Sequence, residues 1–214
     1  MSSVSILRLD IERFQASIAS KLLSTSTRYE ILVRIIEHTS MKMIHIVLSP
    51  DFVKLSSLQP KRSSHLHKLT VVMTPRASDF RVLVKSLRSN NPLTTLNLQN
   101  NSIGNEGALS LSEALKTNTT LTTLNLANNS IGQEGALSLS EALKTNTTLT
   151  TLNLEYNGIG YEGALALLEV LKTNTTLTTL YLQSKWIGKK GALALSEALK
   201  TDNPLTTLDL PTPL

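Results

Sequence analysis

The C-terminal part of the chain alternates between two hydrophobic periods. In the segment LTTLNL, Leu96 and Leu98 alternate with polar residues, which is typical of a strand with one apolar face. In the following segment EGALSLSEALKTN, Ala108, Leu111 and Leu115 have helical spacing. The pattern therefore predicts one strand followed by one helix, with glycines and polar residues in the connection.

This strand–helix unit recurs every 28 residues. The first two units are identical at 24 of 28 positions. A fifth unit begins as NPLTTLDL near the C-terminus. One helix between successive strands requires the strands to be parallel, and it places the helices on one side of the sheet, so the repeat predicts a curved α/β solenoid. The four complete units are residues 91–118, 119–146, 147–174 and 175–202.

The recurring residues resemble the ribonuclease-inhibitor-like leucine-rich repeat family. That resemblance implies a right-handed α/β horseshoe with a parallel concave sheet, convex helices and a buried asparagine ladder at the turns. Asn101, Asn129 and Asn157 occupy the ladder position, whereas the fourth unit has Lys185 there. A lysine cannot both donate and accept as an amide does, so we expect the ladder to end or distort at unit four. The matching residues of the first unit are Leu93, Leu96, Leu98, Asn101, Ile103, Gly104, Gly107, Ala108, Leu111 and Leu115.

The region before the regular repeats is predicted to continue the solenoid in divergent form. Residues 66–90 align with the repeat, with one residue fewer between strand and helix, and form a degenerate unit. Residues 1–65 are interpreted as divergent repeats that cap the solenoid, with a strand in SILRLDI, a helix through Phe14, Ile18 and Leu22, and a loop-like insertion at 49–65. Regular repeats and a terminal strand then occupy 91–214.

Two other classes of protein are compatible with the sequence. Residues 28–50 weakly resemble an F-box, which would make the chain a substrate adaptor of a ubiquitin ligase and requires this segment to be helical. The leading Leu-Pro of that motif is absent, because Arg28 and Tyr29 stand there. The second alternative is a GTPase-activating leucine-rich-repeat protein, for which no local motif is present.

The composition argues against catalysis and bound cofactors. The chain has no cysteine, no catalytic or nucleotide-binding motif, and no apolar run long enough for a membrane span. GKKG at 188–191 replaces an ordinary repeat loop and lacks the Walker spacing. No Asp or Glu accompanies His65 and His67, so we expect neither a metal nor a cofactor. Without a signal-peptide pattern at its start, the chain is expected to be cytoplasmic.

Charge divides the chain near residue 90. Residues 1–90 hold 14 Lys and Arg against 6 Asp and Glu, while residues 91–214 hold 7 against 10. The basic N-terminal part lacks the interleaved aromatic residues that stack on bases, so nucleic acid is disfavoured as a partner.

The differences between units point to a binding site. Units one and two carry small polar residues where the strand passes into the loop, whereas units three and four carry aromatic and basic ones. Tyr and Trp are the usual anchors of protein interfaces. We therefore expect a non-catalytic protein–protein interaction module that binds through its concave face and loop rim. The lysines predict a partner with an acidic surface near an apolar pocket. The candidate residues are Tyr156, Tyr161, Tyr181, Lys185, Trp186, Lys189 and Lys190.

Overall fold

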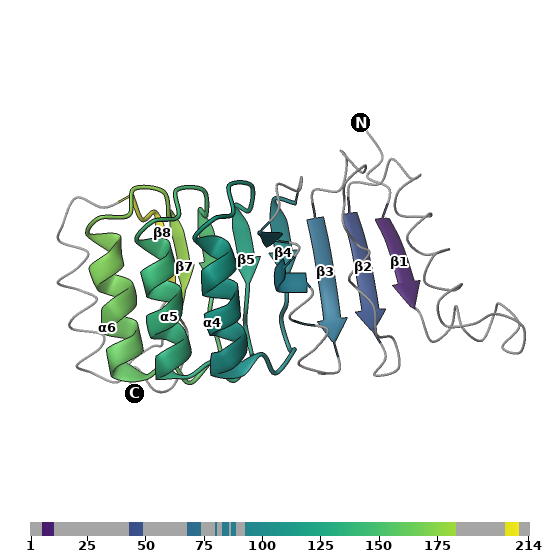
Figure 1. Cartoon of the computed structure of the whole chain (residues 1–214), viewed down its shortest axis with the longest axis horizontal. Coiled ribbons are helices and arrows are strands. Elements are labelled where there is room, and N and C mark those ends of the chain that lie inside the picture. Colours follow the sequence, from purple (N-terminus) through teal and green to yellow (C-terminus); the bar gives the residue numbers. More distant parts are fainter. Residues whose placement is uncertain are drawn as a thin grey trace, which may run out of the picture.

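The computed structural model describes residues 6–10, 43–48, 68–73, 80, 83–85, 87–88, 93–182 and 204–209. Within these residues the chain forms a sheet of eight parallel strands whose spatial order is the order of the sequence (Figure 1). The predicted solenoid is therefore confirmed. The strands are β1 Ile6–Asp10, β2 Met43–Leu48, β3 Lys68–Met73, β4 Thr95–Asn97, β5 Thr123–Asn125, β6 Thr151–Asn153, β7 Thr179–Tyr181 and β8 Thr207–Asp209.

The strand register reproduces the 28-residue repeat. Leu96 of β4 pairs with Leu124 of β5, which pairs with Leu152 of β6. On the N-terminal side Leu69 of β3 pairs with Leu96, as the alignment of the degenerate unit requires. In each of these regular strands the central leucine is buried between two half-buried polar residues. One face of the sheet therefore supplies the core, and the other presents threonine and asparagine.

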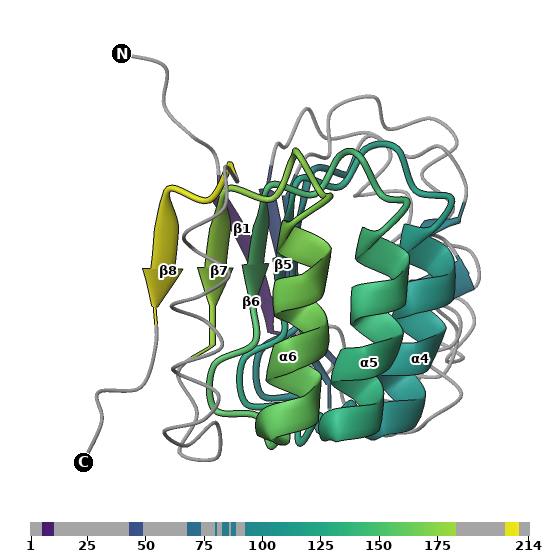
Figure 2. The same cartoon turned by 90° about the vertical axis from the view of Figure 1, so that its left-hand side faces the viewer.

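Three described helices, α4 Gly104–Leu115, α5 Gln133–Leu143 and α6 Gly160–Leu171, cover one face of the sheet (Figure 2). Leu111 and Leu139 have no exposed surface, and the degenerate unit buries Leu83 at their position and Leu87 at the position of Leu115. Glycine permits the close approach of neighbouring helices. A Cβ at Gly135 would lie 2.7 Å from Ile131 Cγ2 and 3.0 Å from Ala108 Cβ, as well as 2.9 Å from the Asn105 amide.

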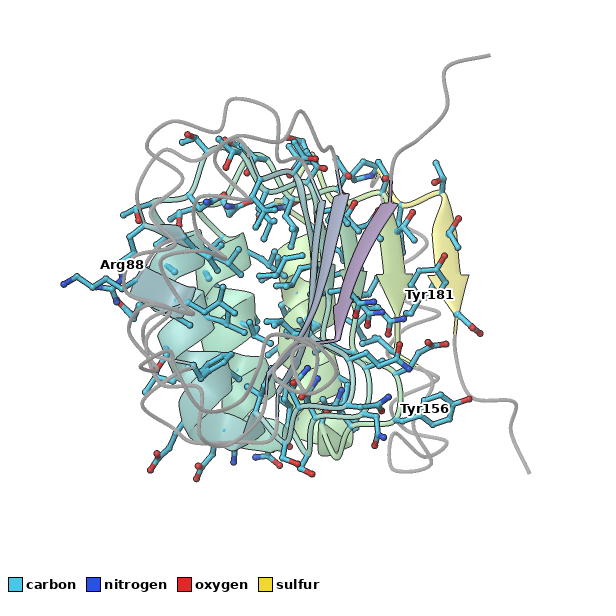
Figure 3. All side chains as sticks on the ribbon, turned by 90° about the vertical axis from the view of Figure 1, so that its right-hand side faces the viewer. Arg88, Tyr156 and Tyr181 are labelled. Carbon is cyan, nitrogen blue, oxygen red and sulfur yellow. The ribbon has the colours of Figure 1, made fainter. Side chains whose placement is uncertain are left out.

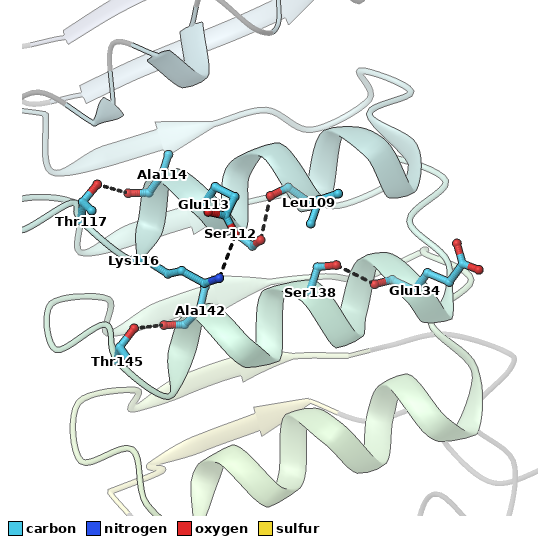
Figure 4. Close-up of polar contacts among 10 residues, drawn as sticks. All are labelled: Leu109, Ser112, Glu113, Ala114, Lys116, Thr117, Glu134, Ser138, Ala142 and Thr145. Carbon is cyan, nitrogen blue, oxygen red and sulfur yellow. Dashed lines mark hydrogen bonds and ion pairs between the residues drawn. The ribbon is translucent and has the colours of Figure 1, made fainter.

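The helices carry the same polar contacts in successive units (Figure 4). Thr117 donates to the Ala114 carbonyl at 3.2 Å, and Thr145 donates to Ala142 at the same distance. Lys116 donates to Glu113 at 2.8 Å, and the equivalent pairs Glu141–Lys144 and Glu169–Lys172 are also present. The hydrogen bond and the charge of Lys116 lower the pKa of the exposed Glu113 carboxyl. Exposed ion pairs of this kind contribute little to stability.

The N-terminal strands test the F-box alternative. Residues Met43–Leu48 form β2, which pairs in parallel with β1 and β3. The F-box interpretation requires a helix there, and it is wrong for this segment. Strand β1 agrees with the predicted strand in SILRLDI. The predicted helix through Phe14, the insertion at 49–65 and His65 lie outside the described residues.

Candidate protein-binding edge

A ladder of buried asparagines fixes the turn that follows each regular strand. Asn129 Oδ1 accepts from the backbone N–H groups of Asn101 and Ile103, at 2.9 and 3.3 Å. One unit further, Asn157 Oδ1 accepts from Asn129 and Ile131 at 3.0 and 2.9 Å. The predicted ladder is therefore confirmed for three units. Lys185, at the next step, lies outside the described residues.

The ladder holds Tyr156 in a backbone conformation that tyrosine rarely adopts. The φ of Tyr156 is 54°, in the left-handed region where Asn100 and Asn128 stand in the preceding units. Asn tolerates this region, whereas a bulky side chain there is an outlier. The neighbouring carbonyl of Glu155 accepts from Asn157 Nδ2 at 3.1 Å and from the Asn128 N–H at 2.9 Å. These bonds fix the turn around Tyr156, whose own surface is 64% exposed.

Tyr161 lies in the first turn of α6 and is 37% exposed. The equivalent residue of unit one, Asn105, has a structural role. Its Oδ1 accepts from the N–H groups of Gly132 and Gly135 at 2.7 and 3.1 Å, so it caps helix α5 of the next unit. A phenol ring cannot reproduce the amide, so unit three replaces a capping residue with an exposed aromatic one.

Tyr181 ends strand β7 in register with Asn153 of β6 and Asp209 of β8. It is half-buried and lies on the face of the sheet opposite the helices. Figure 3 shows that Tyr156 projects on this same side of the sheet. Of the seven candidate residues, the structure therefore places Tyr156 and Tyr181 on the side away from the helices and Tyr161 at the helix start. Lys185, Trp186, Lys189 and Lys190 lie outside the described residues.

The described charges beside the aromatic residues are negative. Glu155 precedes Tyr156 and is half-buried, with Oε2 accepting from Asn153 Nδ2 at 2.8 Å. Glu162 follows Tyr161 in the first turn of α6 and is exposed. The positive charge predicted for this edge thus belongs to the lysines of unit four, whose positions are not described.

A second asparagine ladder was not predicted from the sequence. Asn146 Nδ2 donates to the carbonyls of Leu115 and Asn118 at 2.8 and 3.2 Å. It thereby provides a hydrogen-bond partner for the carbonyl of the last residue of α4 in the preceding unit. Its Oδ1 accepts from the N–H groups of Thr148 and Leu149 at 3.1 and 2.8 Å. Asn118 and Asn174 make the equivalent bonds. The signal in the sequence is the Asn-Thr-Thr run that joins each of the first three regular units to the next, at residues 118–120, 146–148 and 174–176.

Neither a metal site nor a membrane-spanning helix is found in the part of the chain that the structure describes. No group of His, Asp and Glu side chains there could hold a metal ion. None of the helices described there has the length and apolar character needed to cross a bilayer.

Repeating strand–helix units, a single parallel sheet and asparagine-bonded turns define an α/β solenoid of the repeat class. The family description "TMOD/LMOD Leucine-rich domain" matches residues 110–211, and "Leucine Rich repeat" matches residues 89–112. The chain belongs to the leucine-rich-repeat family.

Two solved structures are similar to this chain. The structure titled "Leiomodin-1 Actin-Binding Site 2 (ABS2)" has 32% sequence identity and a TM-score of 0.59, and the alignment covers 66% of this chain and 83% of that one. The tropomodulin C-terminal domain of Caenorhabditis elegans has 22% identity and a TM-score of 0.57, and the alignment covers 63% of this chain and 83% of that one. At that identity the second similarity shows the fold alone. No curated protein sequence gives a significant match.

Proposed function

We propose that this chain is a non-catalytic protein-binding module that engages its partner through the concave face and the loop rim of units three and four. The observation that carries the proposal is Tyr156. It is a large aromatic side chain, exposed, in a left-handed backbone conformation that costs folding free energy. Strain of this kind persists where the surroundings enforce it, and it is concentrated at functional sites.

The other aromatic residues support the same edge. Tyr161 and Tyr181 also replace small polar residues of the preceding units, and Trp186 does so in the sequence of unit four. Tyr and Trp bury large areas with little loss of rotamer freedom, which suits them to anchor an interface. Lys185, Lys189 and Lys190 are expected to face an acidic part of the partner and to speed association.

Actin is the first partner to test. The leiomodin-1 structure, 32% identical to this chain, is titled as an actin-binding site. An actin-binding role agrees with a cytoplasmic location, which the absence of cysteine also favours. It needs no cofactor and no catalytic residue.

The test combines capture and direct binding with the full chain. Purified actin, monomeric and filamentous, is titrated against the wild-type chain, and affinity capture from cytosol with mass spectrometry runs in parallel. Tyr181→Ala and Trp186→Ala should each cost about 2 kcal/mol or more of binding free energy. Asn97→Ala and Asn125→Ala, at the positions equivalent to Tyr181 in units one and two, serve as matched controls and should cost roughly nothing.

Each outcome is informative. If actin fails to bind but capture recovers another protein that depends on Tyr181, the binding module stands and actin is the wrong partner. Recovery of a small GTPase would favour the GTPase-activating alternative. If Tyr181→Ala and Trp186→Ala bind like wild type while the asparagine controls weaken binding, the aromatic edge is not the site. If nothing is retained above a blank resin, the proposed function is wrong.

A further inference from the structure

The exposed aromatic residues of unit three lie on a rim with charges of one sign. We define the acidic-aromatic rim as Glu155, Tyr156, Tyr161 and Glu162. Its two tyrosines are 64% and 37% exposed, so they present apolar ring surface to the solvent. Exposed apolar surface with a polar border is typical of interaction sites.

The distribution of charge along the helices makes the same edge of the solenoid acidic in units one, two and three. The lysines of these units, Lys116, Lys144 and Lys172, lie after the last turn of each helix, and each pairs with a glutamate three residues before it. The segments from the end of each strand to the middle of each helix contain no Lys or Arg: residues 99–110, 127–138 and 155–166. Glu106 and Glu134 are exposed in the first turns of α4 and α5, in line with Glu162 of α6.

We infer that the acidic-aromatic rim docks a basic segment of the protein partner, whose lysine or arginine side chains contact the tyrosine rings and the glutamate carboxylates. This inference rests on the proposed function and specifies the chemistry of the partner. A cation is attracted both by the face of an aromatic ring and by a nearby carboxylate, and the long apolar stem of Lys or Arg covers ring surface. The partner then presents opposite charges to units three and four: basic groups to the acidic-aromatic rim and acidic groups to the lysines.

The observations favour a basic side chain over a purely apolar one. Glu155 is fixed beside Tyr156 by the hydrogen bond from Asn153 to its Oε2, so its carboxylate is held in place before binding. An apolar partner group that covered Tyr156 would bury this carboxylate without a counter-charge, which is costly. A guanidinium or ammonium group offsets that cost.

The test uses the full-length chain and two short fluorescent peptides that differ only in charge. One peptide carries lysines, and the other carries glutamates at the same positions. Because the whole chain has a net charge of +5, non-specific attraction predicts tighter binding of the glutamate peptide. The acidic-aromatic rim predicts tighter binding of the lysine peptide, measured by fluorescence anisotropy at low and physiological ionic strength.

Variants localise the effect. Tyr156→Asn and the double variant Glu155→Gln/Glu162→Gln should each lower the affinity for the lysine peptide about fivefold or more. The double variant should also reduce the dependence of this affinity on salt. The matched control Glu113→Gln/Glu141→Gln makes the same change of net charge at the other end of the helices and should leave binding unchanged.

Equal weakening by the control, or tighter binding of the glutamate peptide, overturns the inference. The inference is also overturned if Tyr156→Asn binds the lysine peptide with the same affinity as the wild-type chain. These results are separable from a failure of the proposed function. If the proposed function is wrong, the capture experiment recovers no protein partner, whatever the result with the peptides.

Discussion

Replacing Tyr156 by asparagine should stabilise this protein, although most substitutions destabilise one. Asparagine stands at the equivalent position of units one and two, with φ values of 62° and 53°. It also extends an existing contact, because Asn128 Nδ2 donates to Asn100 Oδ1 at 2.6 Å. In Tyr156→Asn the introduced amide can donate to Asn128 Oδ1 in the same way.

The expected gain can be worked from the structure. A bulky residue in the left-handed region costs about 1–2 kcal/mol, and asparagine avoids most of this cost. The added hydrogen bond is exposed and contributes about 0.5 kcal/mol at most. On the other hand, the variant loses the contacts that the buried part of the tyrosine ring makes. Since Tyr156 is 64% exposed, that loss is about 0.5–1 kcal/mol. The free energy of unfolding should therefore rise by about 1 kcal/mol.

Urea unfolding followed by far-ultraviolet circular dichroism measures this change, provided that the slope with denaturant stays the same. Two further variants separate the terms. Tyr156→Phe keeps the ring and the strain and should change the free energy by less than about 0.5 kcal/mol. Tyr156→Ala keeps a Cβ in the left-handed region but loses the ring, and it should not stabilise. If Tyr156→Asn is less stable than wild type, the ring has a folding role and the argument from strain fails.

Four other perturbations test the repeat architecture by denaturant unfolding. Deleting residues 119–146 should leave a shorter chain that still unfolds cooperatively, because each unit contacts mainly its neighbours. Leu124→Ala should cost about 2–5 kcal/mol and Thr123→Ala well under about 1 kcal/mol, since only the leucine is buried; equal costs would mean that the strand faces are exchanged. Asn146→Ala should cost about 2–4 kcal/mol, because buried carbonyl and N–H groups lose their partner; a loss below about 1 kcal/mol would show that the second ladder is dispensable. Lys185→Asn should raise the free energy of unfolding by about 0.5–2 kcal/mol, and a lower melting temperature would reveal a structural partner of the lysine.

The regular part of the fold follows from the sequence because one constraint is repeated. A strand and a helix of fixed spacing, copied every 28 residues, permit only a parallel sheet with the helices on one side. The pairing of Leu69 with Leu96 shows that the same logic extends into a unit with little sequence similarity. Residues 28–50 lacked a repeat for comparison, and their short apolar runs fitted a helix and a strand equally well. The pairing of β2 with β1 and β3 decides for a strand at Met43–Leu48.

The sequence proposes the residues of the candidate site, which stay a prediction, but it does not give the backbone geometry of Tyr156. Comparison of the units picks out Tyr156, because it breaks a series of small polar residues. The left-handed φ of that residue depends on bonds from Asn128 and Asn157, and no local pattern specifies it. The capping of α5 by Asn105 was missed for a related reason. The donor and acceptor are separated by 27 residues and belong to different units.

The second asparagine ladder also constrains covalent modification of this chain. Asn118, Asn146 and Asn174 each begin an Asn-Thr-Thr run, which is the acceptor sequence for N-linked glycosylation. All three asparagines are at most 6% exposed, and their Nδ2 atoms donate to carbonyls of the preceding unit. A sugar attached to Nδ2 has no room there and would remove a donor from each seam between units. Glycosylation of these asparagines and the folded solenoid therefore exclude each other.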